Sequence, residues 1–364
     1  MRRVRQAALA GAGFAAISCA SNFVRPSDPR VAIMGRADHA DPNRVRIGYP
    51  GVTLRVRFEG PSLGARFSCS TAASRIAVLV DGGPPRVVRL AAGASEVTLA
   101  SGLGPGSHVV DVVHRTETWQ GIVTVHGFVA SEGARILPVE TRWPERRLLF
   151  IGDSVTCGEA IDRASDCRDE HDAAATSNAY LSYGMLLART LGAQAHLVCY
   201  GGRGLVRDWR GKANVLNGPQ LFDAALPIDG HPSPWDHPTY VPDVVVVSLG
   251  TNDFNLDLGP FPERETYVTA YASFVRAIRG RYPAAHLFLT EGAIVNDEKE
   301  PTRPQKTVLR DYIAETVRRV ADPRVRAVAS NHYAGDACNL HPTREQHAAM
   351  ARDLEPVIRQ AAGW

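Results

Sequence analysis

The feature that most constrains the fold is a change in hydrophobic periodicity near residue 145. From about Val31 to Arg142, apolar residues alternate with polar ones, as in Leu54-Arg55-Val56-Arg57-Phe58. Turn signals such as Asp81-Gly82-Gly83 separate these runs at short intervals. Alternation with a period of two favours half-buried strands, so residues 30–142 are predicted to form an all-β sandwich or jelly roll. The expected strands lie at 54–58, 76–80, 87–90, 109–113 and 122–129.

Beyond the linker at 138–144, strand patterns alternate with helical ones. Apolar runs at 148–151 and 244–247 are typical of buried strands, and helical stripes such as Leu309, Ile313 and Val317 follow such runs. We therefore predict an α/β domain with a central parallel sheet over residues 145–364. The last helix should begin at Thr343, because Thr343 and Gln346 form a capping-box pattern.

Four polar motifs occur in order along this part, the first three of them at predicted strand ends. They are Gly152-Asp153-Ser154, Gly201-Gly202-Arg203-Gly204, Gly250-Thr251-Asn252-Asp253 and His341-Pro342. Carboxyl ends of parallel strands meet at one edge of a sheet, so these turns are expected to lie together.

This set of residues predicts nucleophilic catalysis. Ser154 would attack a carbonyl carbon, and His341 would take its proton. The backbone N–H of Ser154, the backbone N–H of Gly202 and the side-chain amide of Asn252 would hold the oxyanion, with Gly204 as the alternative to Gly202. Asp153 is expected to brace the turn rather than to react.

The ordered motifs resemble those of the SGNH (GDSL-type) hydrolases, and the preceding β domain narrows the resemblance to carbohydrate esterase family 2. The segments that carry it are His114-Arg115-Thr116-Glu117, Phe150 to Gly158, Gly202 to Arg207, and His341-Pro342 followed by His347. The resemblance implies a flavodoxin-like SGNH domain. It also implies a secreted acetyl esterase that needs no cofactor and acts on polysaccharides such as xylan or glucomannan.

The sequence departs from the family pattern at the third member of the triad. Most SGNH hydrolases place Asp three residues before the histidine, whereas this chain has Cys338 there and Asn339 one residue later. We therefore predict a Ser154–His341 dyad, with Asn339 or a backbone carbonyl orienting His341 and Asp336 as the fallback. His347 is expected to pack or to support the site from behind.

The loop from Leu205 to Tyr240 is long for a connection and is predicted to be a substrate-binding insertion. Trp209 and Trp235 lie in it, and either could stack on a sugar ring or simply pack. The histidines form no metal-ligand pattern with nearby carboxylates, so no metal is expected. Because 41 basic and 38 acidic residues are interspersed, no basic face points to nucleic acid.

The N-terminus has the layout of a signal peptide over residues 1–19, with a basic start and a short apolar stretch. Ala16-Ile17-Ser18-Cys19 resembles a bacterial lipobox, so Cys19 is a candidate for lipidation and membrane attachment; plain cleavage nearby is the alternative. Either outcome predicts a secreted or cell-surface bacterial protein, an outer-membrane lipoprotein in the lipidated case. Of the remaining cysteines, Cys157 and Cys167 are the nearest candidates for a disulfide, with buried thiols as the alternative.

Together these observations predict an exported esterase that removes O-acetyl groups from polysaccharides through an acyl-serine intermediate. One alternative is a general short-chain carboxylesterase, lipase or thioesterase on the same fold. The other is a catalytically inactive carbohydrate-binding lipoprotein.

Overall fold

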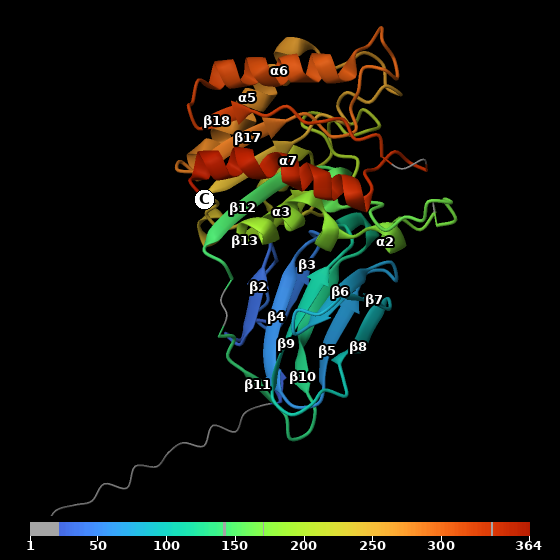
Figure 1. Ribbon diagram of the computed structural model, residues 1–364, viewed down its shortest axis with the longest axis vertical. Helices are drawn as coiled ribbons and strands as arrows, with labels where there is room; N and C mark the ends of the chain where they lie inside the picture. Colours follow the sequence, from blue (N-terminus) through green and yellow to red (C-terminus); the bar gives the residue numbers. More distant parts are fainter. Residues whose placement is uncertain (1–21, 141–142, 170, 336–337) are drawn as a thin grey trace, which may run out of the picture.

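The computed structural model describes residues 22–140, 143–169, 171–335 and 338–364. A β-rich N-terminal part and an α/β C-terminal part lie end to end (Figure 1). The predicted signal peptide, Cys19 included, lies outside the described residues. Within the described ranges, no helix is both long and apolar enough to cross a membrane.

The N-terminal part consists of two antiparallel sheets. One contains β1 (Phe23–Val24), β10 (Val123–Ala130), β5 (Leu63–Cys69) and β8 (Gly93–Ala100), with β3 (Val45–Ile47) paired to β10. The other contains β11 (Arg135–Leu137), β4 (Thr53–Glu59), β9 (Ser107–His114), β6 (Arg75–Val80) and β7 (Arg86–Arg89), with β2 (Val31–Met34) paired to β4. Leu54, Val56 and Phe58 on alternate positions of β4 are fully buried, which confirms the predicted sandwich.

The C-terminal part is built on a five-stranded parallel sheet. Its strand order is β13 (Ala193–Cys199), β12 (Arg146–Gly152), β16 (Val244–Ser248), β17 (His286–Thr290) and β18 (Val325–Ala327). The first strand of this part, β12, is second in the sheet. The next strand, β13, lies at the edge on one side of β12, and the remaining three strands follow in order on its other side. This is the flavodoxin-like order, with its switch point between β12 and β16.

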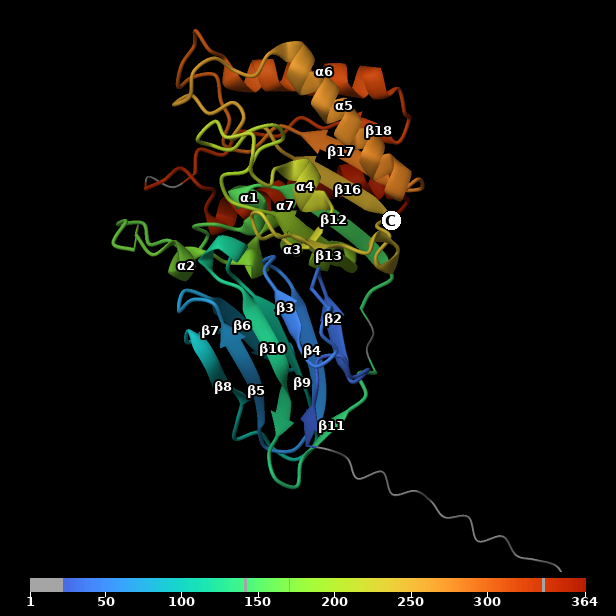
Figure 2. The same cartoon turned by 180° about the vertical axis from the view of Figure 1, so that it is seen from behind.

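Helices cover both faces of this sheet (Figures 1 and 2). On one face, α3 (Tyr183–Leu191) and α7 (Arg344–Ala362) share an apolar cluster with Leu148 and Phe150 of β12. On the other, α5 (Arg264–Arg281) and α6 (Gln305–Val320) share a cluster with Leu149 and Ile151. Because successive residues of a strand point to opposite faces, the continuous apolar run of β12 supplies both layers.

Helix α7 begins where the sequence predicts. The Thr343 N–H donates to Oε1 of Gln346 at 3.0 Å, and the Gln346 N–H donates back to Oγ1 of Thr343 at 3.4 Å. The reciprocal pair satisfies two backbone donors that the first helical turn leaves without intrahelical partners.

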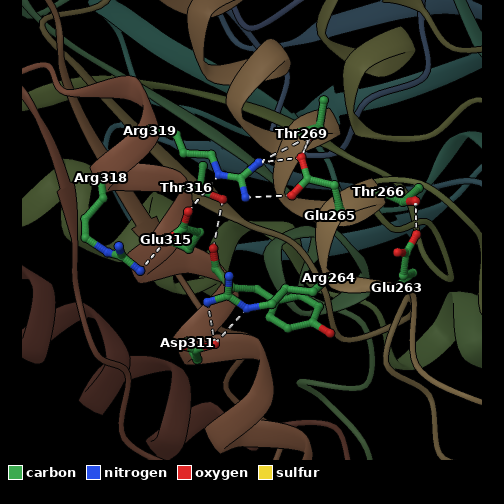
Figure 3. A network of polar contacts seen from close by, with 11 residues as sticks. Glu263, Arg264, Glu265, Thr266, Thr269, Asp311, Glu315, Thr316, Arg318 and Arg319 are labelled. Atoms are coloured by element: carbon green, nitrogen blue, oxygen red, sulfur yellow. Dashed lines mark hydrogen bonds and ion pairs between the residues drawn. The ribbon is translucent and has the colours of Figure 1, made fainter.

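Helices α5 and α6 are joined on their outer side by a polar network (Figure 3). The Arg319 guanidinium of α6 donates to both carboxylate oxygens of Glu265 on α5 at 2.7 Å, and also to Glu315 one turn back on its own helix. Arg264 of α5 reaches Asp311 of α6 at 2.8 Å. Each helix thus supplies an arginine to a carboxylate of the other. These ion pairs fix the position of α5 along α6.

Shorter elements connect these layers. They are η1 (Thr118–Gln120), α1 (Ser154–Cys157), α2 (Ala173–Thr176), η2 (Ala179–Leu181), α4 (Gly218–Phe222), β14 (Ala224–Leu226), β15 (Ser233–Pro234) and η3 (His237–Thr239).

The two parts meet through buried polar contacts. Arg36 is 1% exposed, and its Nη1 donates to the carbonyl oxygens of Phe222 at 2.5 Å and Ala224 at 3.0 Å. The Tyr49 hydroxyl donates to the carbonyl of Leu221 at 2.8 Å. The N-terminal part thereby satisfies carbonyls at the end of α4 and the start of β14 that would otherwise be buried without donors.

The disulfides differ from the predicted pairing of Cys157 with Cys167, which is wrong. Cys157 is bonded to Cys199, and Cys167 is bonded to Cys338, 171 residues away. The strand order explains the first of these bonds. Strands β12 and β13 are neighbours, and Gly152 lies opposite Cys199. The short helix α1 after Gly152 then places Cys157 beside the end of β13. Cys69 is a buried free thiol.

Candidate active site

The turn after β12 presents Ser154 at the carboxyl edge of the sheet. Asp153 caps the short helix α1, where its Oδ1 accepts the N–H of Val155 at 3.1 Å, and Ser154 is the first helical residue. A Cβ atom at Gly152 would lie 2.0 Å from Oγ1 of Thr156, so the tight turn requires glycine there. Asp153 braces the turn in the way the sequence suggested, and burial raises its pKa to about 6.

His341 lies beside Ser154 although 187 residues separate them. Its Nε2 is 2.8 Å from Oγ of Ser154, which is the contact a general base requires. Oδ1 of Asn339 accepts the backbone N–H of His341 at 3.2 Å, so Asn339 contacts the main chain of His341. No described residue bonds to Nδ1 of His341, and Asp336, the fallback orienter, lies outside the described residues.

The predicted oxyanion donors line the same cleft. Gly202 has a left-handed φ of +76°, and a Cβ there would lie 2.5 Å from the ring of Trp209. Nδ2 of Asn252 donates one hydrogen to the carbonyl of Arg203 at 2.8 Å, which leaves its second hydrogen for a ligand. The N–H of Gly204 is instead directed to Oδ1 of Asn217 at 3.4 Å, a placement that favours Gly202 of the two glycines.

Asp253 holds in place the segment that follows the glycine turn after β13. Its buried carboxylate accepts the N–H groups of Leu205, Val206 and Arg207 at 2.7 to 3.1 Å. Burial raises the pKa of Asp253, opposed by these three donors. The acidic residue that follows Asn252 therefore fastens the turn after β13 to the turn after β16.

Both parts of the chain match known families. Residues 33–139 match the carbohydrate esterase 2 N-terminal domain, and residues 150–349 match the GDSL-like lipase/acylhydrolase family. The chain is 40% identical to an acetylxylan esterase / glucomannan deacetylase of Cellvibrio japonicus over 94% of this chain and 92% of that protein. The chain belongs to carbohydrate esterase family 2. It is therefore a serine ester hydrolase.

Solved structures agree with this family. A family two carbohydrate esterase from Cellvibrio japonicus superposes with a TM-score of 0.87 at 40% identity, covering 94% of this chain and 98% of the other. A family two esterase from Clostridium thermocellum, solved in complex with cellohexaose, gives a TM-score of 0.81 at 30% identity, covering 92% of this chain and 99% of that one. The cellulase/esterase CelE of Acetivibrio thermocellus is 31% identical over 93% of this chain, which spans 40% of that longer protein.

In this family 2 esterase, Ser154 and His341 lie in an open cleft of about 930 Å³. Trp209 lines the cleft and is 48% exposed, as a sugar-stacking residue would be. Trp119 of η1 also lines it, with 49% exposure, and sequence reasoning missed it. One feature of the sequence could have indicated Trp119. It lies two residues after Glu117, the last residue of the motif His114-Arg115-Thr116-Glu117 that resembles the family.

The structure does not bring Trp235 to this cleft. It lines a separate groove along the contact between the two parts, and the Arg36 guanidinium lies 4.9 Å from its ring centroid. His196 packs against it edge to face. The predicted insertion is thus split: residues near 202–215 face the active site, while β14 and β15 fold back along the N-terminal part.

Other polar residues near the dyad have distinct surroundings. Nδ1 of His347 accepts the N–H of Tyr183 at 3.1 Å, and burial lowers the pKa of His347 to about 3, so it packs as a neutral ring. Two carboxyls, Glu117 and Glu159, lie close to the site and were not among the predicted site residues. Across the described ranges, no group of three or more His, Cys, Asp or Glu side chains is arranged to hold a metal ion.

Proposed function

We propose that this protein is an exported esterase that removes O-acetyl groups from polysaccharides such as xylan or glucomannan. The observation that carries the proposal is the 2.8 Å contact between Ser154 and His341 in an open cleft of about 930 Å³. An open cleft suits one segment of a long polymer better than a closed acyl-chain tunnel would. The relative named acetylxylan esterase / glucomannan deacetylase and the cellohexaose complex of another relative support a carbohydrate substrate.

The reaction follows from the positions of the residues. His341 Nε2 takes the hydroxyl proton as Oγ of Ser154 bonds to the acetyl carbon. The N–H of Ser154, the N–H of Gly202 and the free amide hydrogen of Asn252 stabilise the oxyanion. The sugar oxygen leaves with the proton from His341, and water then cleaves the acetyl-serine by the same steps in reverse order.

Export is supported by two features. The disulfides Cys157–Cys199 and Cys167–Cys338 are typical of proteins that mature in oxidising compartments. The first nineteen residues have a signal-peptide pattern. Mass spectrometry of the mature N-terminus checks this: a diacylglycerol-modified Cys19 indicates a lipoprotein, and an unmodified N-terminus near it indicates secretion.

The test is acetate release from acetylated xylan and acetylated glucomannan by the mature protein and by Ser154→Ala, with 4-nitrophenyl acetate as a control ester. Release that disappears in the variant supports both the nucleophile and the substrate class. Activity on the control ester alone would remove the polysaccharide assignment. Retained rate on octanoyl esters would favour the lipase or general carboxylesterase alternative instead.

A further inference from the structure

A pair of carboxyl groups lies against the catalytic dyad, one from each part of the chain. Glu117 is the residue before η1 in the N-terminal part, and Glu159 follows α1 in the C-terminal part. A Cβ atom placed on Gly201 would lie 3.0 Å from Oε2 of Glu117 and 3.3 Å from Oε2 of Glu159. Both carboxyls therefore border the space beside Gly201, next to the predicted oxyanion donor Gly202.

The two carboxyls face different partners. Oε2 of Glu117 accepts the N–H of Gly201 at 2.5 Å, so it holds the turn that carries Gly202. Oε2 of Glu159 lies 3.7 Å from Nε2 of His341, on the cleft wall. The pair thus connects the oxyanion turn to the base.

The two carboxyls differ in how deeply they are buried. Glu117 is 1% exposed, and burial together with the neighbouring Glu159 raises its pKa well above the ordinary value. The Glu159 side chain is 17% exposed and lines the open cleft. Burial beside a second carboxyl favours the uncharged form of Glu117, whereas Glu159 is the carboxyl that faces both the cleft and His341.

We infer that Glu159 is a positioning residue for the base: its carboxylate stabilises the imidazolium that forms on His341 when Ser154 gives up its proton, while the uncharged Glu117 fixes the Gly201–Gly202 turn. A carboxylate 3.7 Å from Nε2 supplies negative charge beside the imidazolium in a chain where neither Cys338 nor Asn339 offers a carboxylate. The inference rests on the proposed roles of Ser154 and His341.

The test is the pH dependence of kcat/KM for 4-nitrophenyl acetate in the full-length mature protein and in Glu159→Gln. Loss of a charge about 4 Å from the base disfavours its protonated form, so the acid limb should move to lower pH by about 0.5–1 unit. At the optimum, kcat should fall about tenfold, because the transition state contains the imidazolium. An acid limb within 0.2 unit of the wild type and kcat within twofold would overturn the inference.

Glu117→Gln is the matched control, since it makes the same chemical change at a group already uncharged. Its acid limb should stay in place because the substitution removes no charge, and the turn should hold because the amide oxygen can still accept the N–H of Gly201. If this variant shifts the limb and Glu159→Gln does not, the charge lies on Glu117 and the inference fails. Circular dichroism and thermal melting confirm that both variants are folded.

Other titratable groups face His341 and must be separated from Glu159. Among the described residues these are Asp153 on α1's cap and His347 on α7, with Glu117 behind Glu159. The acid limb should persist in Asp153→Asn; its loss there would assign the limb to Asp153 and overturn the inference. Retained activity in Ser154→Ala would contradict the proposed function itself, whereas an inactive Ser154→Ala beside an unchanged Glu159→Gln would contradict only the inference.

Discussion

At the scale of single residues, Asn252 joins two turns of the active site. Its Nδ2 donates to the carbonyl of Arg203 at 2.8 Å, and that bond fixes the plane of the amide. A fixed amide costs no reorganisation when negative charge develops beside it. The side chain of Asn255 lines the same cleft but donates to the carbonyl of Trp209 at 3.0 Å.

Asn252→Ala is expected to lower kcat on 4-nitrophenyl acetate by about 10²–10³-fold, with a smaller change in KM, because one oxyanion donor is lost. Steady-state kinetics check this. Asn255→Ala serves as the control and should stay within a few-fold of the wild type. A loss below tenfold in Asn252→Ala would remove Asn252 from the oxyanion donors.

Trp119 and Trp209 offer exposed aromatic faces in the cleft. Replacing either with Ala is expected to raise KM for acetylated polysaccharide by about 2–10-fold, the value of one aromatic contact. The change on 4-nitrophenyl acetate should be smaller, since that ester has no sugar chain. Trp235→Ala should instead lower thermal stability, and equal KM changes on both substrates would argue against stacking.

Ser154 and Asn252 could be predicted from the sequence because each follows a strand that its own local pattern identifies, whereas His341 was predicted from its place before Pro342 and the last helix. Ser154 and Asn252 both come directly after apolar runs, and the parallel sheet then places them together. Trp119, Glu117 and Glu159 could not be found in this way. Trp119 and Glu117 reach the site through the packing of the N-terminal part on the C-terminal part, which no local pattern records. Glu159 follows α1 directly, but no pattern in the sequence shows that its carboxyl lies beside His341.

At the scale of elements, the segment before α7 is tied to the loop after α1. The disulfide Cys167–Cys338 places its second cysteine three residues before His341. In sequence these two cysteines look unrelated, because their pairing depends on which loops the tertiary fold brings together. Strand β8 was also not predicted from the sequence, because its exposed Gly93 and Glu96 and its half-buried Ser95 show no apolar alternation.

Cys167→Ser with Cys338→Ser is expected to lower the free energy of unfolding by about 2–4 kcal/mol, because the bridge closes a long loop in the unfolded chain. Activity should fall as well, since the segment that carries His341 loses its anchor. Chemical denaturation and kinetics measure both effects. An unchanged midpoint and unchanged kcat would show that the bridge supports neither stability nor the base.

The ion pairs between α5 and α6 give a pH-dependent contribution to stability. The hydrogen bonds from Arg319 lower the pKa of Glu265 to about 2 from an ordinary value of 4.5. A depressed folded-state pKa means that this contribution is fully present above about pH 4.5 and is lost as the pH falls toward 2.

Glu265→Gln should therefore lower Tm slightly at pH 6, by about 1 °C, because exposed ion pairs contribute little. The difference from the wild type should narrow between pH 4.5 and 3. Glu263→Gln is the control, since Glu263 bonds only to Thr266 in this network. A difference that grows on acidification would contradict the assignment.

At the scale of the whole molecule, the two parts share one apolar core. A single buried cluster contains Val56 and Phe67 of the sandwich together with Phe222 and Tyr267 of the C-terminal part. Beside Phe222 of this cluster, Arg36 of the N-terminal part donates to carbonyls of the C-terminal part. The sequence predicted two parts correctly, yet it gave no sign that their cores would merge, since that depends on three-dimensional contacts between distant segments.

Arg36→Met is expected to destabilise the protein by about 2–4 kcal/mol, because it leaves buried carbonyls without donors. Urea denaturation followed by fluorescence measures the change. Arg44→Gln is the control, since Arg44 is solvent-exposed beside Asp41. A loss no larger in Arg36→Met than in the control would mean that the interface tolerates the missing donor.

The contact between Glu117 and Gly201 has a consequence for how such a gene can change. One end of the hydrogen bond is encoded before residue 140 and the other after residue 145, so recombination between these points separates the two partners. A hybrid that takes its first half from a relative with no hydrogen-bond acceptor at the position of Glu117 would carry a catalytic part whose oxyanion turn has lost this hydrogen bond. The two halves of the coding sequence are therefore expected to be inherited together and not to be exchanged separately.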